Sequence, residues 1–299
     1  TGDGPRPLVL SLCAIKCKQA CVVLFGGDDG ALRVWDPELL TVSHPSRGHA
    51  AAMTCLEADG VSQFAMSGGA DGTLHFWDLK RMRSLTAFGL MGHIGRVSCL
   101  AVDWASDRAV SGGADGFLLC WDLTRGKITS KVRGHYREVA FICADGPSQL
   151  ILSGGREEGA LVLRSWKTLA QQWCIEDCVH SARCAAVNWD SGHILTGGAD
   201  AKLKVWALNS TQEEAILTLG VIDFRAAIVC VVADWTSKQA VSASADGSVR
   251  LWDIERGIAL CSFTGQSGQA ARVQSLAASW PVAVACGRDG ALCCWRLGE

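Results

Sequence analysis

Apolar and polar residues alternate along most of this chain in short runs, which are separated by turns rich in glycine and aspartate. Seven of these runs follow a glycine-rich turn and end on a tryptophan: Trp35, Trp77, Trp121, Trp166, Trp206, Trp252 and Trp295. The separations between them are 42, 44, 45, 40, 46 and 43 residues. Alternation with a period of two predicts β-strands, and a spacing near 43 predicts a repeated supersecondary unit.

The third unit shows the plan of the repeat most clearly. Its pattern predicts four strands, at residues 96–103, 108–112, 117–122 and 127–132. Strands joined by Gly/Asp turns predict one antiparallel sheet, and a sheet this small must stack on its neighbours to bury its apolar faces. The sequence therefore predicts an all-β protein, a seven-bladed propeller of four-stranded antiparallel blades. We assign residues 8–299 to this single domain and residues 1–7 to a separate N-terminal segment.

Composition and charge narrow the possible functions. The 299 residues carry a net charge of −2 with no basic stripe, which argues against a nucleic-acid partner. No apolar run approaches the length of a transmembrane helix, so direct membrane insertion is not expected. The first residues also lack the basic start and apolar stretch of a signal peptide.

The 15 cysteines are expected to be free thiols. Six of them fall in the first strand of successive units and are interpreted as one equivalent position, with Ser275 in the seventh unit: Cys13, Cys55, Cys99, Cys143, Cys184 and Cys230. Equivalent positions around a ring are too far apart for disulfides. No zinc spacing with partner histidines is found, so neither a metal nor another cofactor is predicted. Free thiols in this number indicate a reducing intracellular compartment, the cytoplasm first and an organelle as the alternative.

The chain resembles the WD40 repeat. Gly-His lies about 30 residues ahead of Trp-Asp, with Ser/Thr-Gly-Gly-Ala-Asp-Gly between them, and the resemblance covers residues 8–297. It implies that a histidine, a serine or threonine, an aspartate and the tryptophan of one blade form a hydrogen-bonded relay. The implied sets are His49, Ser67, Asp71 and Trp77; His93, Ser111, Asp115 and Trp121; and His180, Thr196, Asp200 and Trp206.

The other units depart from this set. The fourth keeps His135, Ser153 and Trp166, but Arg156, Glu157 and Glu158 lengthen its turn and displace the aspartate. The sixth has Ser242, Asp246 and Trp252, with Phe224 near the histidine position, and the first and seventh keep only an aspartate and the tryptophan. The histidines and aspartates of these sets also suggest a catalytic dyad. Their recurrence at one offset indicates a structural role instead, and no other enzyme signature appears, so a non-enzyme is predicted.

Closure of the ring raises a question about the N-terminus. The seventh unit ends on its third strand, and residues 1–7 contain two prolines and two glycines, which form a poor strand. Because the chain also lacks an initiator methionine, we expect that Thr1 is not the native start.

Three surface patterns are candidates for partner binding. The residue before each turn aspartate is expected near the channel entrance, where the distinctive side chains are Asp28, Arg288, Arg156, Glu157 and Glu158. Four tryptophans recur between the first and second strands, and they either dock a partner or cover their own hairpins: Trp104, Trp189, Trp235 and Trp280. Two residues before the closing tryptophan, several basic side chains including Arg33 and Arg164 could form a basic ring for nucleic acid, but we expect them to lie along their blades with the charge in water.

Because the repeats supply only a scaffold, function is expected on faces and loops. The sequence favours a non-catalytic scaffold that binds other proteins, as a subunit of a larger assembly, with no small-molecule substrate. One alternative is a substrate receptor of the ubiquitin-ligase type or a signalling adaptor. Another is a peripheral structural subunit of an organellar or cytoskeletal complex.

Overall fold

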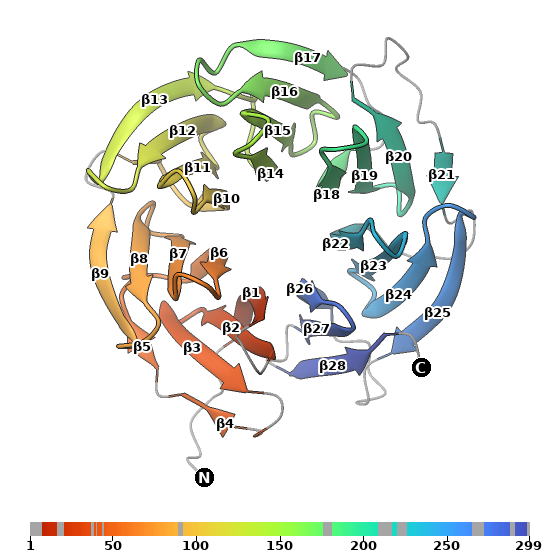
Figure 1. Cartoon of the computed structure of the whole chain (residues 1–299), viewed down its shortest axis with the longest axis horizontal. Coiled ribbons are helices and arrows are strands. Elements are labelled where there is room, and N and C mark those ends of the chain that lie inside the picture. Colours follow the sequence, from red (N-terminus) through yellow and green to blue (C-terminus); the bar gives the residue numbers. More distant parts are fainter. Residues whose placement is uncertain are drawn as a thin grey trace.

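Seven antiparallel sheets stand around a central axis in the computed structural model, and the chain passes from one sheet to the next in sequence order (Figure 1). The structure describes residues 8–16, 21–36, 39, 41–43, 45–88, 92–175, 181–208, 217–219, 226–264, 272–287 and 291–297. The expected all-β, seven-bladed propeller is confirmed. We number the sheets as blades one to seven along the chain.

The strands of each blade follow one another from the axis outward. The inner strands are β1 (Val9–Lys16), β6 (Met53–Asp59), β10 (Val97–Asp103), β14 (Val139–Asp145), β18 (Ala182–Asn188), β22 (Ile228–Asp234) and β26 (Val273–Ser279). The second strands are β2 (Cys21–Gly27), β7 (Phe64–Gly69), β11 (Arg108–Gly113), β15 (Leu150–Gly155), β19 (His193–Gly198), β23 (Gln239–Ser244) and β27 (Val282–Gly287). The third strands are β3 (Ala31–Asp36), β8 (Leu74–Asp78), β12 (Phe117–Asp122), β16 (Leu161–Ser165), β20 (Leu203–Ala207), β24 (Ser248–Asp253) and β28 (Leu292–Arg296).

Outer strands complete six of the blades within the described residues. They are β9 (Arg83–Phe88), β13 (Lys127–Arg133), β17 (Gln171–Ile175), β21 (Leu217–Leu219) and β25 (Ile258–Thr264), and in blade one the short β4 (Thr41–Val42) and β5 (Ser46–Arg47), which both pair with β3. The described part of blade seven has three strands. Residues 1–7, considered above for the fourth strand, lie outside the described residues.

Glycine in the turns between second and third strands allows a backbone that other residues adopt at a cost. Gly72 and Gly116 have φ of +78° and +77°, and a Cβ at Gly116 would lie 2.4 Å from the carbonyl oxygen of His135. Both the conformation and the space therefore call for glycine. These turns bring the Asp-Gly pair against the Gly-His segment that enters the next blade.

Apolar side chains between neighbouring blades form the core. Seven clusters of buried residues are found, and each joins two adjacent blades. The cluster between blades seven and one includes Val9, Leu12, Ala277 and Val284, and the backbone N–H of Leu12 donates to Ser275 Oγ at 3.2 Å. The ring is therefore closed by the same kind of contact that joins its other blades.

Every inner strand contains a β-bulge after its first residue. In blade two, Met53 pairs with Gly69 and Cys55 pairs with Gly68, which leaves Thr54 without a ladder partner. The same shift occurs in the other six blades. A bulge redirects the side chain of its extra residue, and here the redirected positions are the second residues of the inner strands.

Two cysteines depart from the predicted layer. Cys55, Cys99, Cys184 and Cys230 are equivalent, because each is the third residue of its strand and pairs with a glycine or alanine of the second strand. Cys13 and Cys143 lie two residues further along and pair with Leu24 and Leu152. The prediction of six equivalent cysteines was therefore wrong: Ser11 and Phe141 hold the position in blades one and four. A shift of two keeps the strand face unchanged, so alternation alone did not reveal it.

Disulfides, metal-binding clusters and membrane-spanning helices are absent from the described ranges. The cysteines whose side chains the structure describes form no disulfide. No group of three His, Cys, Asp or Glu side chains in these ranges could hold a metal ion. They also contain no helix long and apolar enough to cross a membrane.

Candidate functional site

The relay residues of blade two meet beneath the turn between β7 and β8. The indole N–H of Trp77 donates to Ser67 Oγ at 2.8 Å, and Ser67 Oγ lies 2.7 Å from His49 Nε2. The other ring nitrogen, Nδ1, is 3.2 Å from Asp71 Oδ1. Asp71 also accepts the backbone N–H of Thr73, so it connects the Gly-His segment to the turn.

Blade three repeats this arrangement. Trp121 Nε1 donates to Ser111 Oγ at 2.8 Å, and His93 lies 2.9 Å from both Ser111 Oγ and Asp115 Oδ1. In blade five, Trp206 donates to Thr196 Oγ1 at 2.7 Å, and Asp200 accepts the backbone N–H of Lys202. The predicted fifth-blade histidine, His180, and the sixth-blade Phe224 are outside the described residues. In blade six, Trp252 donates to Ser242 Oγ at 2.8 Å.

Burial decides the protonation of the relay histidines. It lowers the pKa of His49 and His93 even though each ring faces an aspartate. A neutral imidazole has one donor and one acceptor, so Nδ1 donates to the carboxylate and Nε2 accepts the serine O–H. Ser67 and Ser111 are completely buried, and no substrate can approach their hydroxyl groups. The set has the residue types of a catalytic triad, but it is buried and holds the Gly-His segment, the turn and the tryptophan of the blade together.

Blade four differs from the predicted relay at the tryptophan. The relay tryptophan pairs with the residue two before the relay serine, as Trp77 does with Ala65 and Trp121 with Ala109. In blade four that partner is Ile151, and it pairs with Arg164. Arg164 is 8% exposed. Both predictions about this segment were wrong: Trp166 is not the relay tryptophan, and the Arg164 guanidinium does not lie in water.

Trp166 takes the place that Leu79 and Leu123 hold in blades two and three. Its backbone N–H donates to the carbonyl oxygen of Gln149 at 2.8 Å, which matches the bonds from Leu79 to Gln63 and from Leu123 to Asp107. Its indole nitrogen is buried and has no partner. The β15–β16 turn is only one residue longer, since Gly154 pairs with Leu161 where Gly68 pairs with Leu74. Arg164 therefore stands at the place of the relay tryptophan, and Trp166 lies two positions beyond it.

The inserted glutamate replaces the relay aspartate of blade four. Glu158 Oε2 lies 3.2 Å from His135 Nδ1, and Oε1 accepts the backbone N–H of Arg137. His135 Nε2 is 2.9 Å from Ser153 Oγ. The longer glutamate side chain spans the extra residue of the turn. Glu158, predicted as a partner-binding residue, is therefore bound to the relay of its own blade.

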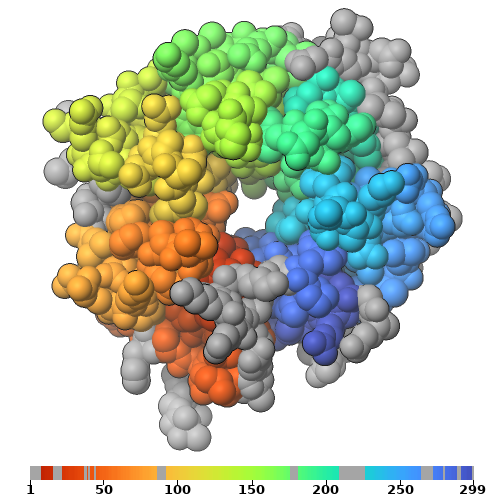
Figure 2. Space-filling view, viewed as in Figure 1, coloured from red at the N-terminus to blue at the C-terminus, as the bar shows by residue number. Residues whose placement is uncertain are grey.

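A pocket of about 360 Å³ lies at one mouth of the central channel. The channel is open through the middle of the ring (Figure 2). All seven bulge residues line this pocket: Leu10, Thr54, Ser98, Ala140, Arg183, Val229 and Gln274. The bulges thus place one side chain from every blade in the mouth, on the same side as the Asp-Gly turns.

Two arginines give the mouth its charge. Arg183 is the cation among the bulge residues, and no carboxylate of the described residues lies within ion-pair distance of it. Arg156 also lines the pocket, but its Nε lies 3.4 Å from Glu138, which is shared with Arg96 at 2.6 Å. Ser11 lines the pocket with a buried hydroxyl that has no partner. The mouth therefore combines polar groups with one guanidinium that pairs with no carboxylate in the described part of the chain.

The remaining predicted rim residues are not gathered in this pocket. Asp28 is exposed, and its Oδ1 accepts the backbone N–H of Leu8 at 3.0 Å. Glu157 pairs with Arg137 at 3.3 Å in water. Arg288 is outside the described residues. Of the four candidates that the structure describes, Arg156 alone lines the channel mouth.

The four recurrent tryptophans pack between blades. Trp104 joins the cluster of blades two and three, where its ring centre is 6.2 Å from that of Phe76. Trp189, Trp235 and Trp280 likewise pack against the cluster shared with the preceding blade. Trp280 Nε1 also donates to Gln239 Oε1 at 3.3 Å. Each ring is half-buried, which favours the covering interpretation; a docking role for them stays a prediction.

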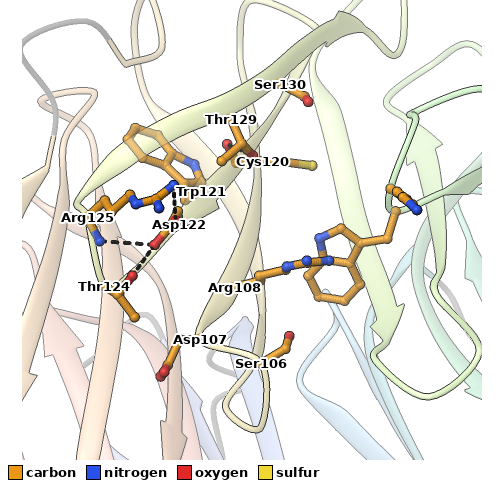
Figure 3. A pocket seen from close by; sticks show the side chains of 12 residues that line it. Ser106, Asp107, Arg108, Cys120, Trp121, Asp122, Thr124, Arg125, Thr129 and Ser130 are labelled. Atoms are coloured by element: carbon orange, nitrogen blue, oxygen red, sulfur yellow. Dashed lines mark hydrogen bonds and ion pairs between the residues drawn. The ribbon is translucent and has the colours of Figure 1, made fainter.

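A second pocket, of about 390 Å³, lies between blades three and four (Figure 3). Of its two carboxylates, Asp107 and Asp122, the second is already bound to the Thr124 hydroxyl and to Arg125. Figure 3 shows these bonds within the turn that follows β12. Asp122 is therefore satisfied by its own turn and is not available to a ligand in this pocket.

Sequence reasoning missed three residues of interest. Arg183 was overlooked because a bulge, rather than a turn, directs it to the channel mouth. Arg164 was named, but its burial was missed because the tryptophan pattern concealed the register of β16. Glu57, on β6, is half-buried, and burial raises its pKa to about 7. It holds the same place in its strand as Cys13 and Cys143 do in theirs, and the misaligned cysteines concealed this equivalence.

Comparison with known proteins agrees with this architecture. Three segments match the family model of the WD domain, G-beta repeat: residues 40–78, 83–122 and 221–253. The chain is also similar to the crystal structure of the computationally designed Ika8 protein, with a TM-score of 0.74 and 22% identity. That alignment covers 99% of this chain and 98% of the other. The likeness to Ika8 concerns the fold alone.

Proposed function

We propose that this seven-bladed propeller of WD40 repeats is a non-catalytic scaffold that binds other protein chains, as a subunit of a larger assembly. WD40 propellers are generally used as protein-interaction scaffolds. The observation that carries the proposal is the channel mouth, where seven bulges direct seven side chains into one pocket. A stiff ring presents such a set without having to change conformation.

The partner surface that fits this mouth is acidic. Arg183 is half-buried and without a carboxylate partner among the described residues, so an aspartate or glutamate side chain of a partner would pair with it. A phosphate dianion is a poorer fit because the second arginine, Arg156, already shares Glu138. The proposal thus includes an acidic loop or terminus of another protein, and no nucleic acid.

The absence of disulfides among the cysteines that the structure describes supports an intracellular, reducing compartment. We take the cytoplasm as the first candidate. The two alternatives stated above, a ubiquitin-ligase substrate receptor or signalling adaptor and a peripheral structural subunit of an organellar or cytoskeletal complex, differ in the partner rather than in the binding surface.

Affinity purification from the native cells, with cross-links mapped to residues, tests this function. The protein is compared with Arg183→Glu and with Arg125→Glu, a matched charge reversal outside the mouth. We expect reproducible partners with cross-links around the mouth, lost with Arg183→Glu and kept with Arg125→Glu. Partners that persist with Arg183→Glu would move the binding surface elsewhere. Recovery of the protein alone in every sample would contradict the scaffold function.

A further inference from the structure

The replacement of the relay tryptophan in blade four leaves a pocket at that position. In blade two, the tip of Trp77 fills the space next to Gly48, where an added Cβ would lie 2.5 Å from the indole. In blade four the corresponding Gly134 meets Arg164 instead, whose Nη2 lies 3.4 Å from the Gly134 carbonyl oxygen. A pocket of about 490 Å³ opens beside it, lined by Arg164 together with Arg133, Gly134, His135, Gln171 and Cys174 among others.

The Arg164 guanidinium has no counter-charge. It is 8% exposed, and no carboxylate of the described residues lies within ion-pair distance of it. Its Nη1 and Nη2 reach only the carbonyl oxygens of Leu169 and Gly134, at 3.3 and 3.4 Å, and its Nε is buried with no partner. A buried charge with incomplete hydrogen bonding is unfavourable, and burial lowers the pKa of this arginine. An anion in the pocket would supply the missing counter-charge and accept hydrogen bonds from the guanidinium.

The charges around the pocket favour an anion with one negative charge. Arg164 and Arg133 contribute two positive charges, and Glu158 contributes one negative charge. Glu158 is bound to His135 and to the backbone N–H of Arg137, and is not available to Arg164. Burial lowers the pKa of His135, so the ring adds no charge at neutral pH. One net positive charge matches a carboxylate, whereas a phosphate dianion needs more donors.

We propose that the blade-four pocket binds a carboxylate-bearing ligand, with the carboxylate pairing with Arg164 inside and Arg133 at the opening. Its volume lies within the usual range of ligand pockets, about 300–1,000 Å³. The site is separate from the channel mouth and shares none of its lining residues. It would add ligand recognition to the scaffold whether or not the mouth binds a protein.

Two sources of the carboxylate are distinguished by choice of probe. Calorimetric titration with sodium benzoate tests a small organic acid. Titration with N-acetylated dipeptides that carry a free C-terminal carboxylate tests a peptide terminus, and the matching C-terminal amides serve as neutral controls. We expect at least one acid to bind and the matching neutral compound, benzamide or the amide, to fail. A peptide terminus is the source if the dipeptide acids bind more tightly than benzoate.

Variants at Arg164 test whether the acid binds in this pocket. Arg164→Gln should weaken binding by about tenfold or more, as expected for loss of a charged hydrogen bond, while Arg125→Gln should leave it unchanged. Arg164→Lys keeps the charge and should retain part of the affinity, and it serves if Arg164→Gln fails to fold. Equal binding of acids and amides, unchanged affinity in the Arg164 variants, or no binding by any probe at millimolar concentration would overturn the proposal.

Discussion

Glu158 Oε2 lies 3.2 Å from His135 Nδ1, the same contact that Asp71 and Asp115 make to the histidines of blades two and three. A glutamate and a longer turn therefore do in blade four what an aspartate and a shorter turn do elsewhere. The Glu158 side chain is 12% exposed, whereas that of the neighbouring Glu157 is 66% exposed.

Removal of this carboxylate should destabilise the fold. Glu158→Ala leaves the N–H groups of His135 and Arg137 without their acceptor, and we expect the free energy of unfolding to fall by about 1.5–3 kcal/mol. Urea denaturation measures it. Glu157→Ala, which removes only a surface pair, should change the free energy of unfolding by less than about 0.5 kcal/mol. Equal effects of the two variants would contradict the structural role of Glu158.

The relay serines should differ in importance. Ser67 serves two partners, His49 and Trp77, but Ser153 serves only His135 because Arg164 stands at the tryptophan position. Ser67→Ala should therefore cost about 2–3 kcal/mol and Ser153→Ala about 1–2 kcal/mol. The comparison is made by urea denaturation at pH 7. A larger loss for Ser153→Ala would be inconsistent with the assigned register of β16.

Acidification should weaken the relay. Burial lowers the pKa of His93 below its unfolded value near 6.5, so below that pH the unfolded chain binds more protons than the folded one. The contribution of His93 is thus present above about pH 6.5 and is lost as the pH falls. We expect the stability difference between the protein and His93→Gln to narrow from pH 7 to pH 5.5.

Glu57 acts in the opposite direction, because its pKa is raised to about 7 and its burial favours the folded state at low pH. This contribution is common to the protein and the His93 variant, so it cancels in the difference between them. As a second control, His193→Gln alters a ring that bonds the Ser191 hydroxyl at the surface. If the difference in unfolding free energy between the protein and His93→Gln does not change with pH, the His93 imidazole is not buried in its neutral form.

Restoring the tryptophan should stabilise blade four. In Arg164→Trp the indole N–H can donate to Ser153 Oγ, as Trp77 does to Ser67, and a buried charge without a counter-ion is removed. We expect a gain of about 1–2 kcal/mol in the free energy of unfolding, measured in urea. The gain should disappear when Ser153→Ala is added; a gain that survives this second change would have another origin.

The period of the tryptophans and the alternation of apolar residues were enough to predict the blades. In blade three the predicted strands 96–103, 108–112, 117–122 and 127–132 differ from β10 to β13 by one residue at most. The relay was accessible for the same reason, since its members recur at fixed offsets. Alternation specifies which face a residue takes but not a shift of two, and both errors of alignment, at the cysteines and at Trp166, were shifts of this kind.

The channel mouth was harder to predict because a β-bulge has no local sequence signature in these strands. Thr54 and Ser98 carry hydroxyl groups and Arg183 carries a guanidinium, so no single side-chain chemistry marks the position. Only the paired register of first and second strands shows that they project to one place. The turn residues considered from sequence lie nearby in the chain, and of these the pocket includes Arg156.

The bulges also separate what holds the ring together from what it presents at its axis. A bulge residue takes no part in the ladder, and five of the seven lie outside the interblade clusters, while Ala140 and Val229 pack against the clusters shared with the next blade. Thr54 also donates to the carbonyl oxygens of Gly68 and Val97. Substitution at Leu10, Arg183 and Gln274 would therefore alter the mouth with little repacking. The fold provides a variable surface whose composition can diverge, by mutation or by a combinatorial library, while the blades stay the same.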